Sequence, residues 1–219
     1  MQKAILSWSG GKDSVLALHE LRKRGEYEAA ALLTTYNSDY GRVFMHGVRI
    51  GLIREQADSL GLPLIEVGLG KDHTSSDYEA AMAAILEEKK AKGFSAVAFG
   101  DIFLEDLRAY RTDRLARAGM EAVFPLWKRD TKELAAAFIG LGYKAVVTCV
   151  DGYELDGELA GSEYDRGFIA KLPPGTDPCG ENGEFHTFTY DGPAFKRMIR
   201  FDKGEKVSKD GRFHFCDLV

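Results

Sequence analysis

The sequence predicts an α/β fold, in which a parallel sheet covered by helices on both faces is followed by a smaller C-terminal α+β domain. In the first two-thirds of the chain, short apolar runs alternate with amphipathic stretches. The apolar runs are nearly continuous, as expected for strands whose two faces are both buried. After Trp127 this rhythm changes, and glycine and proline become frequent. We therefore divide the chain into residues 1–127 and 128–219.

The expected strands and helices of the first part follow in order. Strands are expected at residues 3–8, 28–36, 63–69, 95–100 and 121–126. Helices are expected at 13–25, 48–62, 76–93 and 105–119. Gly25 is expected to end the first helix, and the third is expected to begin with Ser76 as its N-cap and to stop at Gly93. Repeated strand–helix–strand units form right-handed crossovers and hence a parallel sheet. Beyond the boundary, a helix is expected at 131–142 and strands at 144–150 and 184–190.

Composition narrows the class of protein. The net charge of −5 over 219 residues gives no basic footprint, which argues against bulk nucleic-acid binding. No apolar run approaches the roughly 20 residues of a membrane span, so no membrane partner is expected. The cysteines, Cys149, Cys179 and Cys216, are odd in number and far apart. A disulfide framework or zinc site is therefore not expected, and the sequence predicts a cytoplasmic protein.

The stretch "SWSGGKDS" lies where the first strand meets the first helix, at the sheet edge where ligands of open α/β folds bind. Glycines let the backbone approach a ligand, and a helix N-terminus favours an anion. The Walker pattern is absent, because Asp13 follows Lys12 where serine or threonine is required, and the dinucleotide pattern is absent as well. The alternative is a helix cap of small polar residues. The candidate phosphate-binding residues are Ser9, Gly10, Gly11, Lys12, Asp13 and Ser14.

Ser-Gly-Gly-x-Asp-Ser resembles the PP-loop of the ATP pyrophosphatases, whose domain is Rossmann-like and of the adenine nucleotide alpha hydrolase type. The resemblance implies that ATP is cleaved between the α- and β-phosphates while the loop holds the pyrophosphate. It places adenine against Leu33–Thr35 and Phe99–Asp101, with Thr34, Gly100 and Asp101 as contacts, and gives Asp13 a part in holding Mg²⁺. From the residues alone, Thr34 is equally a β-branched strand end, and Asp101 is also an N-cap candidate.

Two arginines follow Asp101 in "GDIFLEDLRAYR". If the helix begins near Leu104, Arg108 and Arg111 are one turn apart and can face the phosphates together. A guanidinium at the α-phosphate would stabilise the charge that builds as pyrophosphate leaves. The alternative is a solvated helix face, on which both arginines pair with neighbouring carboxylates.

A third unusual stretch is "CGENGEFHTF", residues 179–188. Strand alternation places Glu184 and His186 on one face, where a carboxylate and an imidazole can do acid/base work or orient an amine. Cys179 is a nucleophile candidate, although a packed, inert thiol is the stronger interpretation. The sequence leaves open whether His46, in "MHGV", faces the site.

With these motifs in this order, the whole chain resembles the diphthine–ammonia ligase family. The resemblance implies that a substrate carboxylate attacks the α-phosphate of ATP, and that ammonia or an amine then displaces AMP to leave an amide. It also implies a smaller domain that closes over the substrate and faces the carboxylate-bearing acceptor with Glu181, Asn182, Glu184, His186, Thr187 and His46. The family pattern Glu-x-Gly-Glu-aromatic-Glu-Thr differs here, because His186 replaces the last glutamate. Chains with this histidine resemble a branch from organisms that make no diphthamide, so the acyl acceptor is left unassigned.

Other functions compete with this interpretation. A tRNA-modifying PP-loop enzyme usually needs paired or clustered cysteines, which this chain lacks. A non-catalytic adenine-nucleotide-binding regulator would bind ATP without releasing AMP. Homo-oligomer formation stays open, since exposed apolar faces cannot be told from buried ones in a sequence.

Overall fold

A computed structural model describes all residues of the chain, 1–219. The helices are α1 Lys12–Arg24, α2 Ile50–Leu60, α3 Ser75–Ala91, α4 Glu105–Arg117, α5 Thr131–Gly140 and α6 Arg166–Lys171. The strands are β1 Gln2–Ser7, β2 Tyr27–Asn37, β3 Arg42–Val43, β4 Leu64–Leu69, β5 Phe94–Ala98, β6 Glu121–Val123, β7 Lys144–Asp151, β8 Phe185–Asp191, β9 Lys203–Lys209 and β10 Phe213–Leu218. No helix is long and apolar enough to cross a membrane.

The first sheet is the predicted parallel sheet. Its strands run in the order β3-β2-β1-β5-β6, with β4 paired to β2, and only β3 is antiparallel to its neighbour. The chain winds from β1 outward to β2 and β4, then crosses back to β5 and β6. The winding direction therefore reverses between β1 and β5, which is where open α/β sheets bind their ligands.

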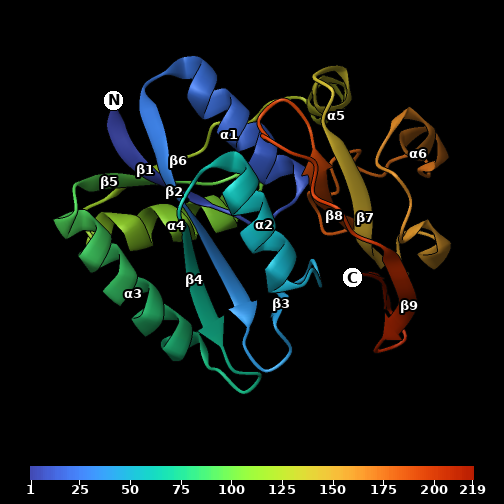
Figure 1. Cartoon of the computed structure of the whole chain (residues 1–219), viewed down its shortest axis with the longest axis horizontal. Coiled ribbons are helices and arrows are strands. Elements are labelled where there is room, and N and C mark those ends of the chain that lie inside the picture. The colour runs from blue at the N-terminus through green and yellow to red at the C-terminus, as the bar shows by residue number, and fades with distance from the viewer.

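Both faces of this sheet are covered, which explains the continuous apolar runs. Ile5, Leu33 and Val97 pack into a cluster with residues of α3 and α4. Their neighbours Leu6 and Leu32 point the other way, into a larger cluster with α1 and α2. Figure 1 shows α3 on one side of the sheet and α1 and α2 on the other, toward the second sheet. The predicted fold class is confirmed.

Some element ends differ from the predicted ones. Gly25 ends α1 with a left-handed φ of 70°, as expected. The N-cap of α3 is Thr74 rather than Ser76, because Thr74 and Asp77 form a reciprocal capping box. Strand β6 ends at Val123, three residues before the predicted end, and the following residues turn away.

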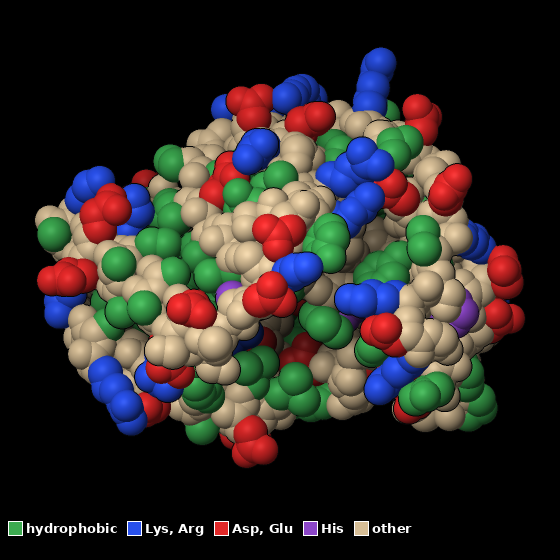
Figure 2. Space-filling view, turned by 90° about the horizontal axis from the view of Figure 1, so that it is seen from below, with side chains coloured by type: hydrophobic (Ala, Val, Ile, Leu, Met, Phe, Trp, Pro, Cys, Tyr) green, Lys and Arg blue, Asp and Glu red, His purple; other side chains and the backbone are tan.

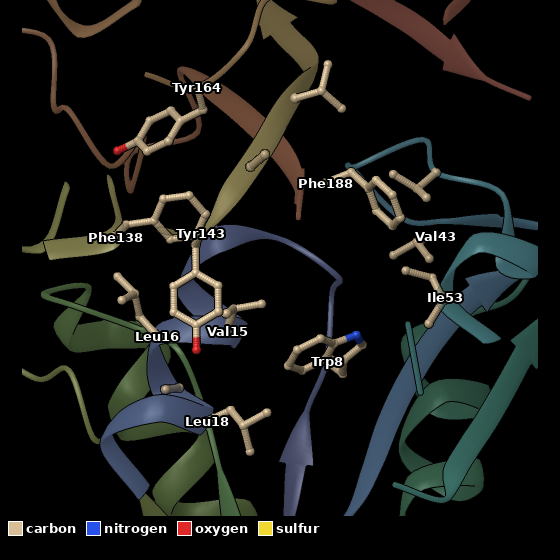
Figure 3. Close-up of a cluster of buried hydrophobic side chains, with 14 of the residues drawn as sticks. Trp8, Val15, Leu16, Leu18, Val43, Ile53, Phe138, Tyr143, Tyr164 and Phe188 are labelled. Atoms are coloured by element: carbon tan, nitrogen blue, oxygen red, sulfur yellow. The ribbon is translucent and has the colours of Figure 1, made fainter. Parts of the chain in front are cut away.

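The second sheet is antiparallel, with strands in the order β8-β7-β10-β9. Strands β9 and β10 and helix α6 were not expected from the sequence. A single buried cluster joins Trp8 and Val15 of the first part to Phe138, Tyr164 and Phe188 of the second (Figure 3). Because this core is shared, the division at residue 127 stays a prediction. The shared core fixes β8 against the start of α1.

Candidate nucleotide site at the switch point

The turn between β1 and α1 is tightly packed from behind. Gly10 has a φ of 81°, and a Cβ there would lie 2.5 Å from Cδ1 of Ile53 and 2.8 Å from Oε1 of Gln56. Gly100, at the end of β5, lies against the start of α1, so that a Cβ would lie 3.0 Å from the Asp13 carbonyl carbon. Glycine is therefore required at Gly10 both for its backbone angle and for its neighbours.

Gln56 organises this turn, and the sequence analysis missed it. Its Oε1 accepts a hydrogen bond from Nε1 of Trp8 at 2.8 Å. Its Nε2 donates to the carbonyl oxygens of Gly10 at 3.0 Å and Thr189 at 2.5 Å. Gln56 is fully buried on α2. The signal that could have found it is an uncharged polar residue on the apolar face of a helix.

Two serine hydroxyls close the turn from inside. Oγ of Ser14 accepts from the backbone N–H of Ser9 at 3.1 Å and lies 2.9 Å from Oγ of Ser9. Oγ of Ser9 also accepts from the N–H of Gly11 at 3.3 Å. Both side chains are thus placed beside the start of α1, where the helix dipole favours an anion.

The second sheet supplies the cap of α1. Gly11 stands at the N-cap position and has no side chain to cap the helix. Instead, the hydroxyl of Thr187 on β8 accepts from the N–H of Lys12 at 3.1 Å. The N–H of Thr189 donates to the Gly10 carbonyl at 2.8 Å. The turn is therefore clamped between α2 and β8, which are far apart in the sequence.

The Lys12 side chain is buried between the two parts of the chain. Nζ donates to Asp13 at 2.9 Å and to the carbonyl of Cys179, and it lies 5.2 Å from the centre of the Phe185 ring. Burial alone would lower the pKa of Lys12, but the adjacent Asp13 carboxylate raises this pKa above its usual value. Lys12 therefore stays charged and fixes Asp13 beside the turn.

Three carboxylates face the site. Oδ1 of Asp13 is buried without a hydrogen-bond partner, and Asp101 forms an ion pair of 2.8 Å with Arg111. Oε1 of Glu181, from the C-terminal loop, accepts from the N–H of Ile102 at 2.6 Å. Burial raises the pKa of Glu181 to about 7, and the charges of Asp13 and Asp101 add to this rise.

The carboxylates fit a nucleotide-bound Mg²⁺ better than a protein-enclosed metal. No group of three or more His, Cys, Asp or Glu residues in the chain is placed to hold a metal ion. Mg²⁺ in phosphate sites is held by one or two carboxylates together with the substrate phosphates. Asp13, with its unpartnered oxygen, and Asp101 offer this arrangement.

A cavity of about 940 Å³ extends from this turn along the sheet between α3 and α4. Leu86 is the buried residue of α3, and it lines this cavity together with Tyr78 and Met82 of the same helix. Its inner wall is apolar, with side chains such as Leu33, Val97 and Phe99, while the end at the turn is polar. Its volume suits a small organic ligand. On the face of the molecule seen in Figure 2, acidic and basic side chains are interspersed.

The structure separates several residues that the sequence analysis grouped. Arg111 lines the cavity, but the Arg108 guanidinium lies 4.5 Å from the centre of the Trp127 ring and does not line it. The Thr34 hydroxyl is buried and donates to the Trp8 carbonyl at 2.6 Å, so that Thr35 is the threonine on the cavity wall.

The C-terminal loop is likewise divided. Glu184 is buried, and its carboxylate accepts from the N–H of Asn182 at 3.0 Å, from the Asn182 side-chain amide at 3.0 Å and from the N–H of Asp177 at 3.3 Å. Glu184 and Asn182 therefore shape the loop and do not line the cavity, whereas Glu181 and His186 do. The expected shared face of Glu184 and His186 does not form, because β8 begins at Phe185.

Cys179 is not activated. Its Sγ lies 3.3 Å from the Thr131 carbonyl, and burial raises the pKa of its thiol well above the usual value. Cys149 and Cys216 are also buried and free. The packed, inert interpretation of Cys179 agrees with this geometry.

The fold and site together define an α/β nucleotide-binding protein with a PP-loop-type turn at its switch point. Residues 1–122 match the diphthamide synthase N-terminal domain, and residues 130–217 match the diphthamide synthase C-terminal domain. The chain therefore belongs to the diphthamide synthase family.

Individual relatives agree with this membership. A diphthine–ammonia ligase from Bos taurus is 26% identical over 232 residues, which cover 91% of this chain and 83% of the relative. One from Danio rerio is 29% identical over 167 residues, covering 69% of this chain and 65% of the relative. One from Homo sapiens is 25% identical over 232 residues, covering 91% and 82%. The chain is accordingly an enzyme of the ATP-dependent ligase class.

Proposed function

We propose that this enzyme activates a carboxylate with ATP and joins it to ammonia or an amine, releasing AMP and pyrophosphate. The observation that carries the proposal is the Ser9–Ser14 turn at the switch point, where the start of α1 opens into a ligand-sized cavity. Ammonia is the amine in the names of the relatives. The acceptor is a carboxylate, with diphthine, also named there, as one candidate to be tested.

The residues divide the first step between them. The N–H groups at the start of α1, with the Ser9 and Ser14 hydroxyls, hold the β- and γ-phosphates as they leave as pyrophosphate. An acceptor oxygen attacks the α-phosphorus, and the bond to the β-phosphate oxygen breaks. Arg111, held by Asp101 at 2.8 Å, stabilises the charge that develops there. Asp13 and Asp101 would hold Mg²⁺, which neutralises phosphate charge when bound.

The second step takes place toward β8. Ammonia attacks the acyl carbon of the adenylate, the bond to the AMP oxygen breaks, and the nitrogen loses one proton to become an amide. Glu181, whose loop reaches over the end of β5, covers this side of the cavity. Three buried, unpaired cysteines support a reducing cytoplasm as the location of the enzyme.

The test is to incubate the protein with Mg²⁺ and ATP labelled at the α-phosphate, adding ammonium and candidate carboxylates in turn. AMP with pyrophosphate, produced faster with one acceptor, is the expected result. Asp13→Asn should lower this turnover at least 100-fold, whereas Asp113→Asn, in an exposed pair with Arg117, should not. Formation of ADP, or tight ATP binding without any product, would contradict the ligase and indicate a nucleotide-binding regulator.

A further inference from the structure

Two imidazole rings meet on the wall of the cavity that β8 supplies. His46 comes from the turn between β3 and α2, and His186 comes from β8; their ring centres are 4.7 Å apart at an angle of 39°. Both line the cavity beside Thr187. A Cβ on Gly11 would lie 2.9 Å from Cε1 of His46, so this ring lies directly on the phosphate-binding turn.

The hydrogen bonding of the pair is incomplete. Nδ1 of His46 lies 3.0 Å from the Thr187 carbonyl oxygen. Because a carbonyl only accepts, Nδ1 carries the proton, and Nε2 of a neutral His46 is left as an acceptor. Nε2 of His186 is buried and has no partner. A buried polar nitrogen without a partner is costly, and a ligand in the cavity can satisfy it.

The surroundings keep both rings uncharged. Burial lowers the pKa of His46 to about 4 and lowers the pKa of His186 well below its usual value. Lys12 of α1 is the charged group that acts on both rings, and it also disfavours imidazolium. From β10, Asp217 is paired with Arg42 at 2.7 Å and Arg49 at 2.6 Å, so its charge is compensated within the turn. Two neutral rings are the consequence, and Nε2 of His46 is an acceptor.

The turn that carries His46 is held firmly in place. The two ion pairs of Asp217 fix its ends, and the Arg42 guanidinium also donates to the Gly47 carbonyl at 2.8 Å. A Cβ on Gly47 would lie 2.7 Å from the Phe215 ring. The second sheet therefore positions His46 as well as His186.

We propose that His46 and His186 form the binding site for the amine nucleophile and take it in its uncharged form, an inference that rests on the proposed ligase function. With His186 in the tautomer that carries its proton on Nδ1, two N–H groups of ammonia donate to Nε2 of His46 and Nε2 of His186, and the lone pair of ammonia is left for the acyl carbon. The C–N bond forms as the bond to the AMP oxygen breaks. The adduct nitrogen then loses one proton to water, which leaves the amide.

Other uses of the pair fit the structure less well. A metal site would need a further ligand, and no group of three His, Cys, Asp or Glu residues is placed to supply one. A general base that works near neutral pH needs a pKa close to the working pH. Neutral rings without a carboxylate partner suit an uncharged, hydrogen-bond-donating ligand instead.

The experiment is ¹⁵N NMR of the protein labelled on its five histidines, titrated with ammonium chloride in the presence of MgAMP. The signals of His46 and His186 should show neutral rings and shift with ammonium but not with equal sodium chloride. The total ammonium at half-shift should be about 100-fold lower at about pH 8.5 than at about pH 6.5, because the uncharged fraction rises tenfold per pH unit. The rings themselves do not titrate in this interval, since the pKa of His46 is about 4.

Two variants test whether the shift with ammonium depends on the histidine pair. His186→Phe keeps a ring and breaks no side-chain hydrogen bond, so it should abolish the shift of His46 with ammonium. His73→Gln is the matched control, because the ring of His73 packs against Phe44 at an angle of 49° and does not line the cavity. Equal shifts with sodium chloride, a pH-independent half-point, or an unchanged His46 response in His186→Phe would overturn the proposal. The wild-type titration decides by itself if a variant does not fold.

A separate calorimetric titration with MgATP distinguishes the two proposals. Binding of MgATP without the ammonium response would overturn only the amine site. Absence of MgATP binding would contradict the ligase function, while the ammonium response would still support or overturn the amine site.

Discussion

Replacing Thr187 with valine tests the link between the second sheet and the phosphate-binding turn. The Thr187 hydroxyl accepts from the N–H of Lys12 at 3.1 Å, and both residues are buried. Valine leaves this N–H without a partner, at the helix end that has no cap of its own. A buried donor left unpaired costs about 1–3 kcal/mol of the free energy of unfolding.

The same strand offers a matched control. Thr189 lies two residues further along β8, is equally buried, and its hydroxyl has no hydrogen-bond partner. Thr189→Val removes a buried hydroxyl that bonds to nothing, while its backbone N–H and carbonyl keep their bonds to Gly10 and Gln56. This substitution should leave the free energy of unfolding unchanged or raise it by up to about 1 kcal/mol.

Equilibrium unfolding in urea, followed by the fluorescence of the two tryptophans, of which Trp8 is buried, measures both variants. Thr187→Val should lower the urea midpoint by roughly 0.5–1 M, and the melting temperature by about 2–4 °C for each kcal/mol lost. It should also weaken MgATP binding, because the start of α1 is no longer fixed. Equal losses in the two variants, or a larger loss in Thr189→Val, would refute the cap and reduce both threonines to packing residues.

Two further predictions concern a glycine and a carboxylate. Gly10→Ala should lower the free energy of unfolding by about 2 kcal/mol or more in the same urea assay, because φ is 81° and Cδ1 of Ile53 lies 2.5 Å from the new Cβ. The control is Gly51→Ala, in open space on α2, which should raise the free energy of unfolding by up to about 1 kcal/mol. The pKa of Glu181 is about 7 in the folded chain and 4.5 ordinarily, so the folded chain binds this proton more tightly than the unfolded chain. The free energy of unfolding should therefore fall by at most about 3 kcal/mol as the pH rises from 4.5 to about 7. Urea midpoints measured against pH should be flatter in Glu181→Gln, and parallel profiles would contradict the burial of this carboxyl.

The local pattern of the sequence was enough to predict the first sheet and its ligand-binding edge. Continuous apolar runs such as Ile5–Leu6 indicated strands buried on both faces, and each pair of neighbours does face a different helical layer. Alternation of strands and helices fixed a parallel sheet, because crossovers have one hand. The Ser9–Ser14 turn could be located at the switch point for the same reason. These features depend on residues close together in the chain.

The tertiary structure decided which of the candidate residues share a surface. Their spacing on one helix allowed both Arg108 and Arg111 to face the phosphates. In the structure the Arg108 guanidinium packs on the Trp127 ring, and only Arg111 lines the cavity. Glu184 looked like a partner of His186, but the loop before β8 needs its carboxylate to bind Asn182. Each outcome depends on a contact that spacing along one helix or strand does not specify.

The cap of α1 and the histidine pair also depend on the tertiary structure and not on the local sequence. Lys12, Thr187 and His46 lie far apart in the sequence, and Gln56 belongs to none of its motifs. They meet because the second sheet docks its β8 strand on α1 through a shared apolar core (Figure 3). Hydrophobic burial is non-directional, so a sequence shows which residues are buried while only the packed chain shows what each one touches.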